Sequence, residues 1–330
     1  MAETKTPIIS FKNFSFQYRA QKQPTLHDIN LDIYPGERVL IAGPSGSGKS
    51  TLAACINGLN PFSNPGECTG SLTVDGVDAP HSSIFELADH VGTVLQDPDG
   101  QFIGLTVAED IAFALENSCT PQKEMHETTR RVAELVGIEN HLDYAPHELS
   151  GGQKQRVSLA GVMVDQVRIL LFDEPLANLD PATGKQAIEL IDEIQKKTDT
   201  TVLIIEHRLE DVLWRNVDRI VLVNGGTILA DLRPDELLSG SLLAENGIRE
   251  PLYVTALRYA GVDITPDKHP AHVDSLVLDD TDTQKLRDWF TARPRPAAQP
   301  EREPLLEVKG LSFGYQKGQQ TLRDLSLIHI

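Results

Sequence analysis

The chain has 330 residues and a formal net charge of −18, and 40% of its residues are hydrophobic. This length suits two domains, or one large domain with part of another. The acidic charge disfavours nucleic acid as a partner, because binding it requires clustered basic side chains, and it also disfavours direct adhesion to anionic lipid. No run of about 18 apolar residues predicts a membrane span. The first residues, MAETKTP, lack the pattern of a signal peptide.

Short apolar or alternating runs predict strands in the first hundred residues. These strands cover residues 8–16, 26–33, 39–42, 72–74 and 91–95. Proline and glycine separate the first three, and a helix is expected to begin near Lys49, directly after a glycine-rich loop. The three cysteines, Cys55, Cys68 and Cys119, match no metal or disulfide pattern and are interpreted as free thiols of a reducing cytosol.

The pattern becomes helical from about residue 96 to residue 164. Helices are predicted over residues 107–115 with Thr106 as the cap, over 128–136, over 152–165 and from 181 onwards. Buried strands are predicted at residues 169–172, 202–205 and 220–223, and residues 228–230 pair with the last of these across the turn 224–226. Strands that alternate with helices indicate an α/β core with a mostly parallel sheet, to which an antiparallel N-terminal portion and a helical insertion are attached.

The domain organisation is predicted from composition and from an internal repeat. Residues 1–240 form the main domain, residues 241–292 a small appendage of unclear fold, and residues 293–304 a proline-rich linker. Residues 306–315 and 321–327 then echo residues 9–18 and 25–31. We expect residues 305–330 to be the start of a second, incomplete copy of the main domain, in a tandem protein cut short before its second phosphate loop. Chance similarity of two β-rich stretches is the alternative.

Residues 43–50 read GPSGSGKS and fit the pattern G-x-x-x-x-G-K-[ST] of a phosphate-binding loop. Glycines let successive backbone N–H groups turn inward toward phosphate oxygens, and the following helix adds its positive end. Lys49 is expected to reach the β- and γ-phosphates and Ser50 to bind Mg²⁺. The nucleotide-binding residues predicted here are Gly43, Pro44, Ser45, Gly46, Ser47, Gly48, Lys49, Ser50 and Thr51.

Two adjacent carboxylates, Asp173 and Glu174, follow the apolar run 169–172. The carboxyl edge of a parallel sheet is where such folds bind ligands. Asp173 is therefore expected to hold Mg²⁺, and Glu174 to activate the attacking water as the catalytic base. Without a phosphate loop, two solvated acids at a strand end would be the better interpretation.

The segment LSGGQ at residues 149–153 places Ser150, Gly151, Gly152 and Gln153 at a predicted helix start, which suits an anion. A capped helix with a glycine turn is the alternative. At this point the chain resembles the ATP-binding-cassette (ABC) family, whose signature is LSGGQ. The resemblance implies a P-loop NTPase (RecA-like) core with a helical subdomain. It also implies that this segment binds the γ-phosphate of ATP held by a second ABC domain.

Four further positions match the family pattern: Tyr18, Gln96, Asp180 and His207. The resemblance implies that Tyr18 stacks on adenine, although a tyrosine on a strand surface is an equal alternative. It implies that Gln96 contacts Mg²⁺ and the attacking water, and that Asp180 belongs to a loop crossing the domain interface. His207 would contact the γ-phosphate, whereas a lone histidine after a strand is usually structural. The expected catalytic set is Glu174, His207, Gln96 and Lys49.

Residues 96–102, 106–117 and 205–210 are similar to the energy-coupling-factor group of this family. That resemblance implies an ATPase subunit on the cytoplasmic face of the cell membrane. It would work with an integral membrane subunit and a substrate-binding membrane component, and would drive uptake of a vitamin or a metal ion. Two rival hypotheses are a non-transport ABC ATPase acting on the ribosome or DNA, and an inert dimerisation module. The acidic charge argues against the first, and the complete set of motifs argues against the second.

Overall fold

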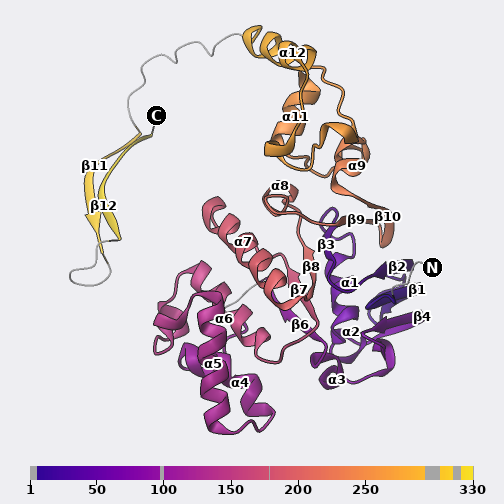
Figure 1. The fold of residues 1–330 in the computed structure, drawn as a ribbon, viewed down its shortest axis with the longest axis vertical. Coiled ribbons are helices and arrows are strands. Elements are labelled where there is room, and N and C mark those ends of the chain that lie inside the picture. Colours follow the sequence, from indigo (N-terminus) through magenta and orange to yellow (C-terminus); the bar gives the residue numbers. More distant parts are fainter. Residues whose placement is uncertain (1–5, 97–99, 178, 294–304, 315–320, 330) are drawn as a thin grey trace. The chain divides into compact units, whose positions relative to one another are not determined.

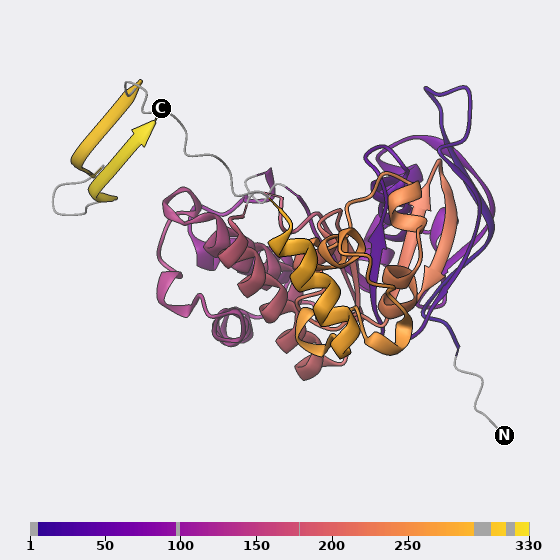
Figure 2. The same ribbon diagram turned by 90° about the horizontal axis from the view of Figure 1, so that it is seen from above.

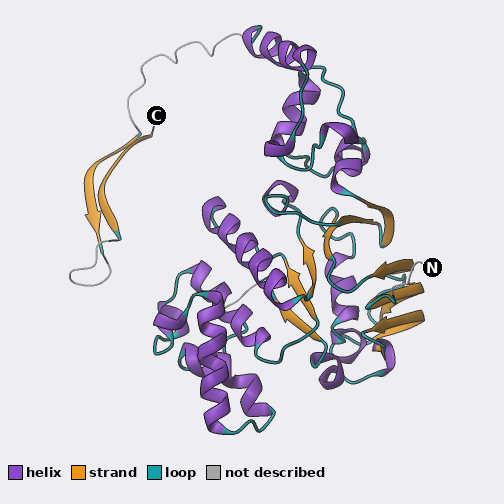
Figure 3. Ribbon diagram, in the orientation of Figure 1, coloured by secondary structure: helices purple, strands orange, loops and turns teal. Residues whose placement is uncertain are grey.

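The computed structural model describes residues 6–96, 100–177, 179–293, 305–314 and 321–329. The chain forms two compact units, Met1–Leu286 and Arg287–Ile330. Figure 1 shows the strands and helices of the first unit, and Figure 3 shows how they alternate. This α/β arrangement agrees with the fold class expected from the sequence. None of the helices in the described residues is long and apolar enough to cross a membrane.

A six-stranded sheet forms the centre of the first unit, in the order β10-β9-β3-β8-β7-β6. Its strands are β3 (Arg38–Ala42), β6 (Val91–Val94), β7 (Ile169–Asp173), β8 (Thr201–Ile205), β9 (Arg219–Asn224) and β10 (Thr227–Leu232). All neighbours are parallel except β9 and β10, which form the predicted hairpin. Every residue of β3 and β8 is buried, as expected for strands covered on both faces. The carboxyl ends of β3, β7 and β8 therefore meet at one edge.

An antiparallel sheet lies beside this core, in the order β2-β1-β4-β5. Its strands are β1 (Ile9–Tyr18), β2 (Leu26–Ile33), β4 (Gly66–Val74) and β5 (Val77–Asp78). Strand β4 is longer than the predicted segment 72–74. Its first half is mostly polar, and it is a strand because it pairs with β1 as far as Tyr18 opposite Gly66. The apolar face of this sheet packs with α1 (Lys49–Ile56) in one buried cluster.

A helical subdomain follows β6 in the sequence. It contains α4 (Val107–Asn117), α5 (Gln122–Val136) and α6 (Gly151–Met163), and α7 (Pro181–Thr198) packs against α6. Figures 1 and 2 both show the subdomain and the antiparallel sheet at opposite ends of this unit. The predicted cap Thr106 accepts the N–H of Glu109 in a capping box. Helix α5 begins six residues earlier than predicted, because its polar first turns carry no apolar periodicity.

Short helices complete the first unit. They are α2 (Leu59–Phe62), α3 (Ile84–Ala88), α8 (Leu209–Val212), α9 (Pro234–Ser239), α10 (Leu242–Glu245), α11 (Leu252–Tyr259) and α12 (Asp280–Thr291), the last of which continues into the second unit. The helices of the appendage pack against the main domain. Leu243 and Leu257 of the appendage belong to the same buried cluster as the sheet. In addition, Glu210 of α8 accepts the backbone N–H of Leu252 at 3.0 Å.

The second unit contains the hairpin of β11 (Leu306–Phe313) and β12 (Leu322–His329). Its register repeats that of β1 and β2. The corresponding pairs are Leu306–His329 and Ile9–Ile33, Val308–Leu327 and Phe11–Leu31, Leu311–Leu325 and Phe14–Ile29, and Phe313–Leu322 and Phe16–Leu26. Two positions with positive φ also recur, because Asn13 and Asp28 correspond to Gly310 and Asp324. The two hairpins therefore have the same strand register and backbone conformation as well as similar sequences. Most of the predicted linker, and Tyr315 of the repeat, lie outside the described residues.

Candidate functional site

The phosphate-binding loop connects β3 to α1. Gly46 and Gly48 have φ angles of 75° and 106°, which side chains other than glycine rarely adopt. A Cβ atom on Gly43 would come within 2.0 Å of the carbonyl oxygen of Val223. The hydroxyl of Ser47 is buried in the loop and has no hydrogen-bond partner among the described residues. This loop therefore requires its glycines, and a phosphate oxygen would satisfy the Ser47 hydroxyl.

Lys49 lies across this loop. Its Nζ donates to the carbonyl oxygens of Gly43 and Pro44, both at 2.9 Å, and only 6% of the residue is exposed. Burial lowers the pKa of Lys49, and the nearby carboxylates Glu174 and Asp173 partly oppose that effect. The structure thus brings the ammonium group of Lys49 and the two carboxylates at the end of β7 into one electrostatic environment.

Asp173 lies at the end of β7, and its Oδ1 accepts the hydroxyl of Ser50 at 3.4 Å. Burial raises the pKa of Asp173, and the neighbouring charge of Glu174 raises it further. One carboxylate and one hydroxyl are a suitable protein contribution to a magnesium nucleotide site, because Mg²⁺ keeps waters and phosphate oxygens as its other ligands. The described residues contain no cluster of three or more His, Cys, Asp or Glu side chains that could hold a metal by themselves.

Glu174 is held by two neighbouring segments, which follow β6 and β8. Its backbone has a φ of 50°, and its N–H donates to the carbonyl oxygen of Ile205 at 2.9 Å. Gln96 Nε2 donates to Glu174 Oε2 at 3.0 Å, and His207 Nδ1 lies 3.9 Å from Oε1. The predicted catalytic residues Gln96, Glu174 and His207 therefore come together from the ends of three strands.

Glu206 is a residue of this site that the sequence analysis missed. It is fully buried, and its Oε1 accepts the backbone N–H groups of His207 at 2.9 Å and Arg208 at 3.1 Å. The same oxygen lies 3.2 Å from His207 Nδ1. Glu206 therefore orients the histidine loop. The available signal was an acidic residue at a buried strand end, which is the pattern already used for Asp173.

The backbone that follows Glu174 is held by two donors that were also missed. Gln155 of α6 is largely buried, and its Nε2 donates to the carbonyl oxygen of Pro175 at 2.5 Å. Arg208 donates to the carbonyl oxygen of Leu176. The position of Glu174 thus depends on the helix of the LSGGQ segment and on the histidine loop.

Tyr18 lies at the end of β1 beside the helix of the phosphate loop. Its hydroxyl lies 3.1 Å from Thr51 Oγ1, and its ring makes an edge-to-face contact with Phe16 at 4.8 Å between centroids. The predicted adenine-stacking residue is therefore near the loop, and its hydroxyl is bonded within the protein.

The remaining predicted residues lie at the starts of α6 and α7. Ser150 accepts the N–H of Gln153 at 3.4 Å, and Gln153 accepts that of Ser150 at 2.8 Å, so the two form a capping box. Asp180 caps α7 through the N–H groups of Ala182 and Thr183. The hydrogen bond from the Thr183 hydroxyl, with those from the backbone, lowers the pKa of Asp180. Asn178 of the same loop lies outside the described residues.

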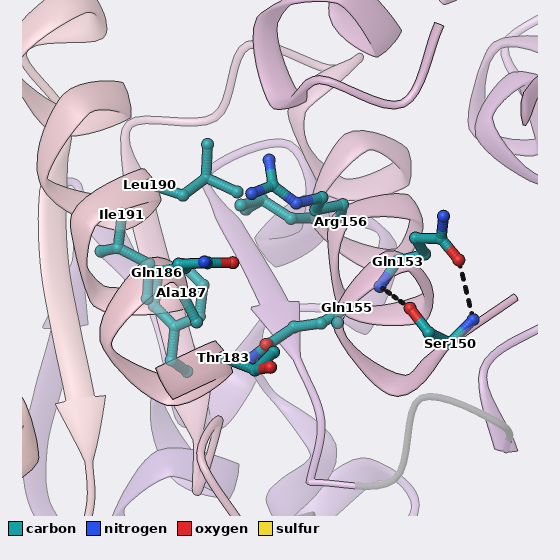
Figure 4. A pocket seen from close by; sticks show the side chains of 12 residues that line it. Ser150, Gln153, Gln155, Arg156, Thr183, Gln186, Ala187, Leu190 and Ile191 are labelled. Carbon is teal, nitrogen blue, oxygen red and sulfur yellow. Dashed lines mark hydrogen bonds between the residues drawn. The ribbon is translucent and has the colours of Figure 1, made fainter. Parts of the chain in front are cut away.

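A cavity of about 170 Å³ separates α6 from α7 (Figure 4). Gln155, Arg156 and Gln186 are among the side chains that line it. The two helices approach closely at one point, because a Cβ on Gly152 would lie 2.7 Å from the methyl group of Thr183. The polar contacts of Ser150 and Gln153 are with each other and with His141, so the LSGGQ segment forms a second polar surface apart from the cluster around Glu174.

Comparison with known proteins identifies the family and the fold. Residues 26–177 match the family model described as ABC transporter. A solved structure of the ATPase CbiO1 from Clostridium perfringens, described as part of the ABC transporter complex CbiONQ, superposes with a TM-score of 0.66 at 29% identity, covering 77% of this chain and 100% of CbiO1. A dimeric ATP-binding cassette in a post-hydrolysis state with ADP and phosphate gives a TM-score of 0.59 at 26% identity, covering 68% of this chain and 98% of that structure. The chain therefore carries a P-loop ATPase domain and belongs to the ABC transporter family.

A second family model matches another part of the chain, and curated relatives match nearly all of it. Residues 240–313 match the model described as ATP-binding cassette cobalt transporter. An ABC transporter ATP-binding protein of Clostridium perfringens is 57% identical over 319 residues, which is 97% of this chain and 56% of that protein. One from Enterococcus faecalis is 54% identical over 326 residues, or 98% of this chain and 57% of that protein. The chain spans little more than half the length of these curated relatives.

Proposed function

We propose that the first unit binds MgATP on residues 43–51 and hydrolyses it in a composite site. The observation that carries this proposal is the convergence of Gln96, Glu174 and His207 beside the phosphate loop. Each of these groups follows a different strand of the main sheet. Such convergence is typical of a site that positions a water against a phosphate group.

In this proposal the residues act mainly by position. Glu174 accepts a proton from the attacking water, and Gln96 and His207 keep that carboxylate and the water aligned. Lys49 moves from its loop carbonyls to the β- and γ-phosphates, where it stabilises developing negative charge. Ser50 and Asp173 hold Mg²⁺, which would neutralise phosphate charge when bound. Tyr18 stacks on the adenine base.

The other half of the site comes from a second ABC domain. The helix start at Ser150, Gly151, Gly152 and Gln153 suits an anion and forms a surface apart from the cluster around Glu174. We propose that this surface closes over the γ-phosphate of ATP held by the partner domain, with Asp180 at the interface. The partner is either another copy of this chain or the domain that the β11–β12 hairpin begins.

We further propose that the protein is the ATPase subunit of an importer and works at the cytoplasmic face of the membrane. Large apolar side chains are exposed before and within α4: Ile103 at 65%, Leu105 at 81% and Phe113 at 38%. Such a surface suits an integral membrane subunit, which would act with a separate substrate-binding membrane component. The cobalt-transporter description of the matching model favours a metal ion over a vitamin as the imported substrate. Residues 97–99, within the segment 96–102 that resembles the energy-coupling-factor group, lie outside the described residues.

The alternative function, action on the ribosome or DNA, is not favoured. The net charge of −18 opposes binding to nucleic acid, and both family models that match are described as transporters. Isolation from membranes together with integral subunits would support the importer. Isolation with ribosomes instead would favour the alternative.

Nucleotide binding tests the central proposal directly. MgATP binding is measured by calorimetry for the wild-type chain and for Lys49→Ala. Loss of a charged hydrogen-bond donor is expected to weaken binding on the order of 10- to 100-fold. Absence of measurable MgATP affinity in the wild-type protein, or an unchanged affinity in the variant, would overturn the proposal.

A further inference from the structure

Asn60 is a buried polar residue outside the motifs considered so far. It lies in α2, shortly after the helix of the phosphate loop, and only 1% of it is exposed. Its Nδ2 faces three acceptors: the Tyr18 hydroxyl at 3.3 Å, the carbonyl oxygen of Thr51 at 3.4 Å and Cys55 Sγ at 3.8 Å. Its Oδ1 accepts Asn64 Nδ2 at 3.0 Å. Both ends of the amide are thus bonded, as a buried amide requires.

The Tyr18 hydroxyl links Asn60 to the phosphate-loop helix. Because Asn60 has no acceptor on its nitrogen, it donates to the hydroxyl oxygen of Tyr18. The proton of that hydroxyl is then available for Thr51 Oγ1, 3.1 Å away. Thr51 directly follows Ser50, so these hydrogen bonds connect the end of β1 to the residues expected to bind nucleotide.

The Tyr18 ring is also held at its other end. It meets the buried ring of Phe16 at 4.8 Å between centroids with an interplanar angle of 85°. Phe16 is fully buried, and β1 pairs with β4 as far as Tyr18 opposite Gly66. With its hydroxyl bonded and its edge packed, the ring has little freedom to change rotamer.

We propose that Asn60 is a positioning residue for the base of the bound nucleotide. It fixes the Tyr18 ring in the orientation that stacks on the base, and Thr51 ties that orientation to the phosphate loop. This inference rests on the proposed function, which places triphosphate on the loop and Tyr18 against the adenine. An aromatic side chain that is already ordered loses less conformational freedom on binding, so base affinity depends on Asn60.

The proposal separates the base from the phosphates. Stacking uses the face of the base, whereas the phosphates bind the loop and Lys49. Loss of Asn60 should therefore weaken ligands that carry a base and leave inorganic tripolyphosphate unaffected. A purely structural role for Asn60 would instead lower thermal stability or weaken both ligands together.

The experiment compares binding of MgATP and magnesium tripolyphosphate to the full chain by calorimetry. The variants are Asn60→Ala, Tyr18→Phe and the double variant. Each single substitution breaks the Asn60–Tyr18 hydrogen bond, together with the other bonds of the side chain that is removed. Each is expected to weaken MgATP binding about fivefold, with no change for tripolyphosphate. The double variant is expected to bind like either single variant, because both substitutions break the same contact.

Asn57→Ala is the matched control. Asn57 lies three residues before Asn60, and its Nδ2 donates to Thr93 Oγ1 at 3.1 Å and not to Tyr18. Its Oδ1 accepts the backbone N–H of Leu59 at 3.2 Å, so this variant loosens the start of α2 without removing the Asn60–Tyr18 bond. It should leave the ratio of the two affinities unchanged. Tyr18→Phe leaves Asn60 in place, so it tests the idea even if Asn60→Ala folds poorly.

Additive effects in the double variant, or an equal loss for both ligands, would overturn this role for Asn60. A wild-type protein that binds both ligands while Asn60→Ala and Tyr18→Phe keep the wild-type MgATP affinity would overturn this inference alone. A wild-type protein that binds neither ligand would overturn the proposed function as well.

Discussion

The hairpins β1–β2 and β11–β12 have the same register, the same positions of positive φ and the same hydrogen bond from a backbone N–H to a serine hydroxyl. That bond joins Ser15 to the N–H of Asp28 at 2.9 Å in the first hairpin, and Ser312 to the N–H of Asp324 at 3.0 Å in the second. Their surroundings differ. The apolar side chains of β1 and β2 are largely buried against the core. In the second hairpin, six large apolar side chains are exposed: Leu306, Leu311, Phe313, Leu322, Leu325 and Leu327.

This difference shows that hairpin formation is determined locally, whereas burial of the hairpin is determined by tertiary packing. Residues with suitable turn and strand preferences form the hairpin in both places, because its hydrogen bonds are internal. Burial depends on what packs on the apolar face, and only the first hairpin has β4 and α1 beside it in the described structure. The first hairpin also places Tyr18 beside the phosphate-loop helix. The proposed role of Tyr18 therefore depends on the packing of this hairpin.

The largest expected effect is on the rate of ATP hydrolysis. The residues proposed to hydrolyse ATP lie in the first unit, so Glu174→Gln should lower the hydrolysis rate on the order of 10²- to 10⁴-fold by removing the general base. MgATP binding should persist. Phosphate release is measured beside the control Phe313→Ala, which should keep the wild-type rate. Wild-type turnover in Glu174→Gln would contradict the assignment of the base.

Stability gives a matched pair of substitutions. Phe16 is fully buried and Phe313, at the equivalent position, is 47% exposed. Phe16→Ala should lower the free energy of unfolding by about 3–5 kcal/mol through the cavity it creates. Phe313→Ala should change it by no more than about 0.5 kcal/mol. Urea denaturation followed by circular dichroism measures both. Equal losses would show that the second hairpin is buried in the purified protein.

The shared serine hydrogen bond predicts a smaller, local effect. Ser15→Ala and Ser312→Ala each remove about 1 kcal/mol of local stabilisation. The amides of Asp28 and Asp324 should then exchange about fivefold faster in the respective variant if exchange occurs by local opening. Hydrogen exchange measured by NMR tests this. An Asp324 amide that already exchanges at the unfolded rate in the wild-type protein would argue against a formed second hairpin.

The smallest expected effect is on thermal stability, because the buried charge of Asp173 in the first unit destabilises the native state. Burial and Glu174 raise the pKa of Asp173 above its ordinary value. Its charged form therefore destabilises the native state at neutral pH, and this cost disappears as pH falls through the raised pKa. Asp173→Asn should raise the melting temperature by about 1–2 °C at pH 7, with a gain that shrinks toward pH 4. A gain that grows on acidification would contradict this sign.

Much of the fold was predictable because its signals are local. The apolar runs of β3, β7 and β8, the cap at Thr106 and the α/β alternation were predicted from the sequence and are found in the structure. The capped helix considered as an alternative at Ser150 is also present. The start of β4 and the appendage helices were not predicted, since polar or weakly periodic segments become ordered there by contact with β1 and with the main core.

The motifs named most of the candidate site, but not its supporting residues. Lys49, Asp173 and Glu174 stand in recognisable spacings, whereas Glu206, Gln155 and Asn60 are ordinary residues in the printed sequence. Gln155 and Asn60 position other residues through hydrogen bonds to segments distant along the chain, and Glu206 does so at the buried end of β8. No spacing rule records such contacts.

The sequence by itself determined the family, the phosphate loop and the repeated hairpin, because glycine geometry, hydrophobic period and turn chemistry act between near neighbours. The tertiary structure decided which hairpin is buried, how the ends of β3, β7 and β8 converge, and which polar side chains hold Tyr18 and Glu174. The physical reason is that burial and shared hydrogen bonds depend on segments brought together by packing, and their partners are far apart in the chain.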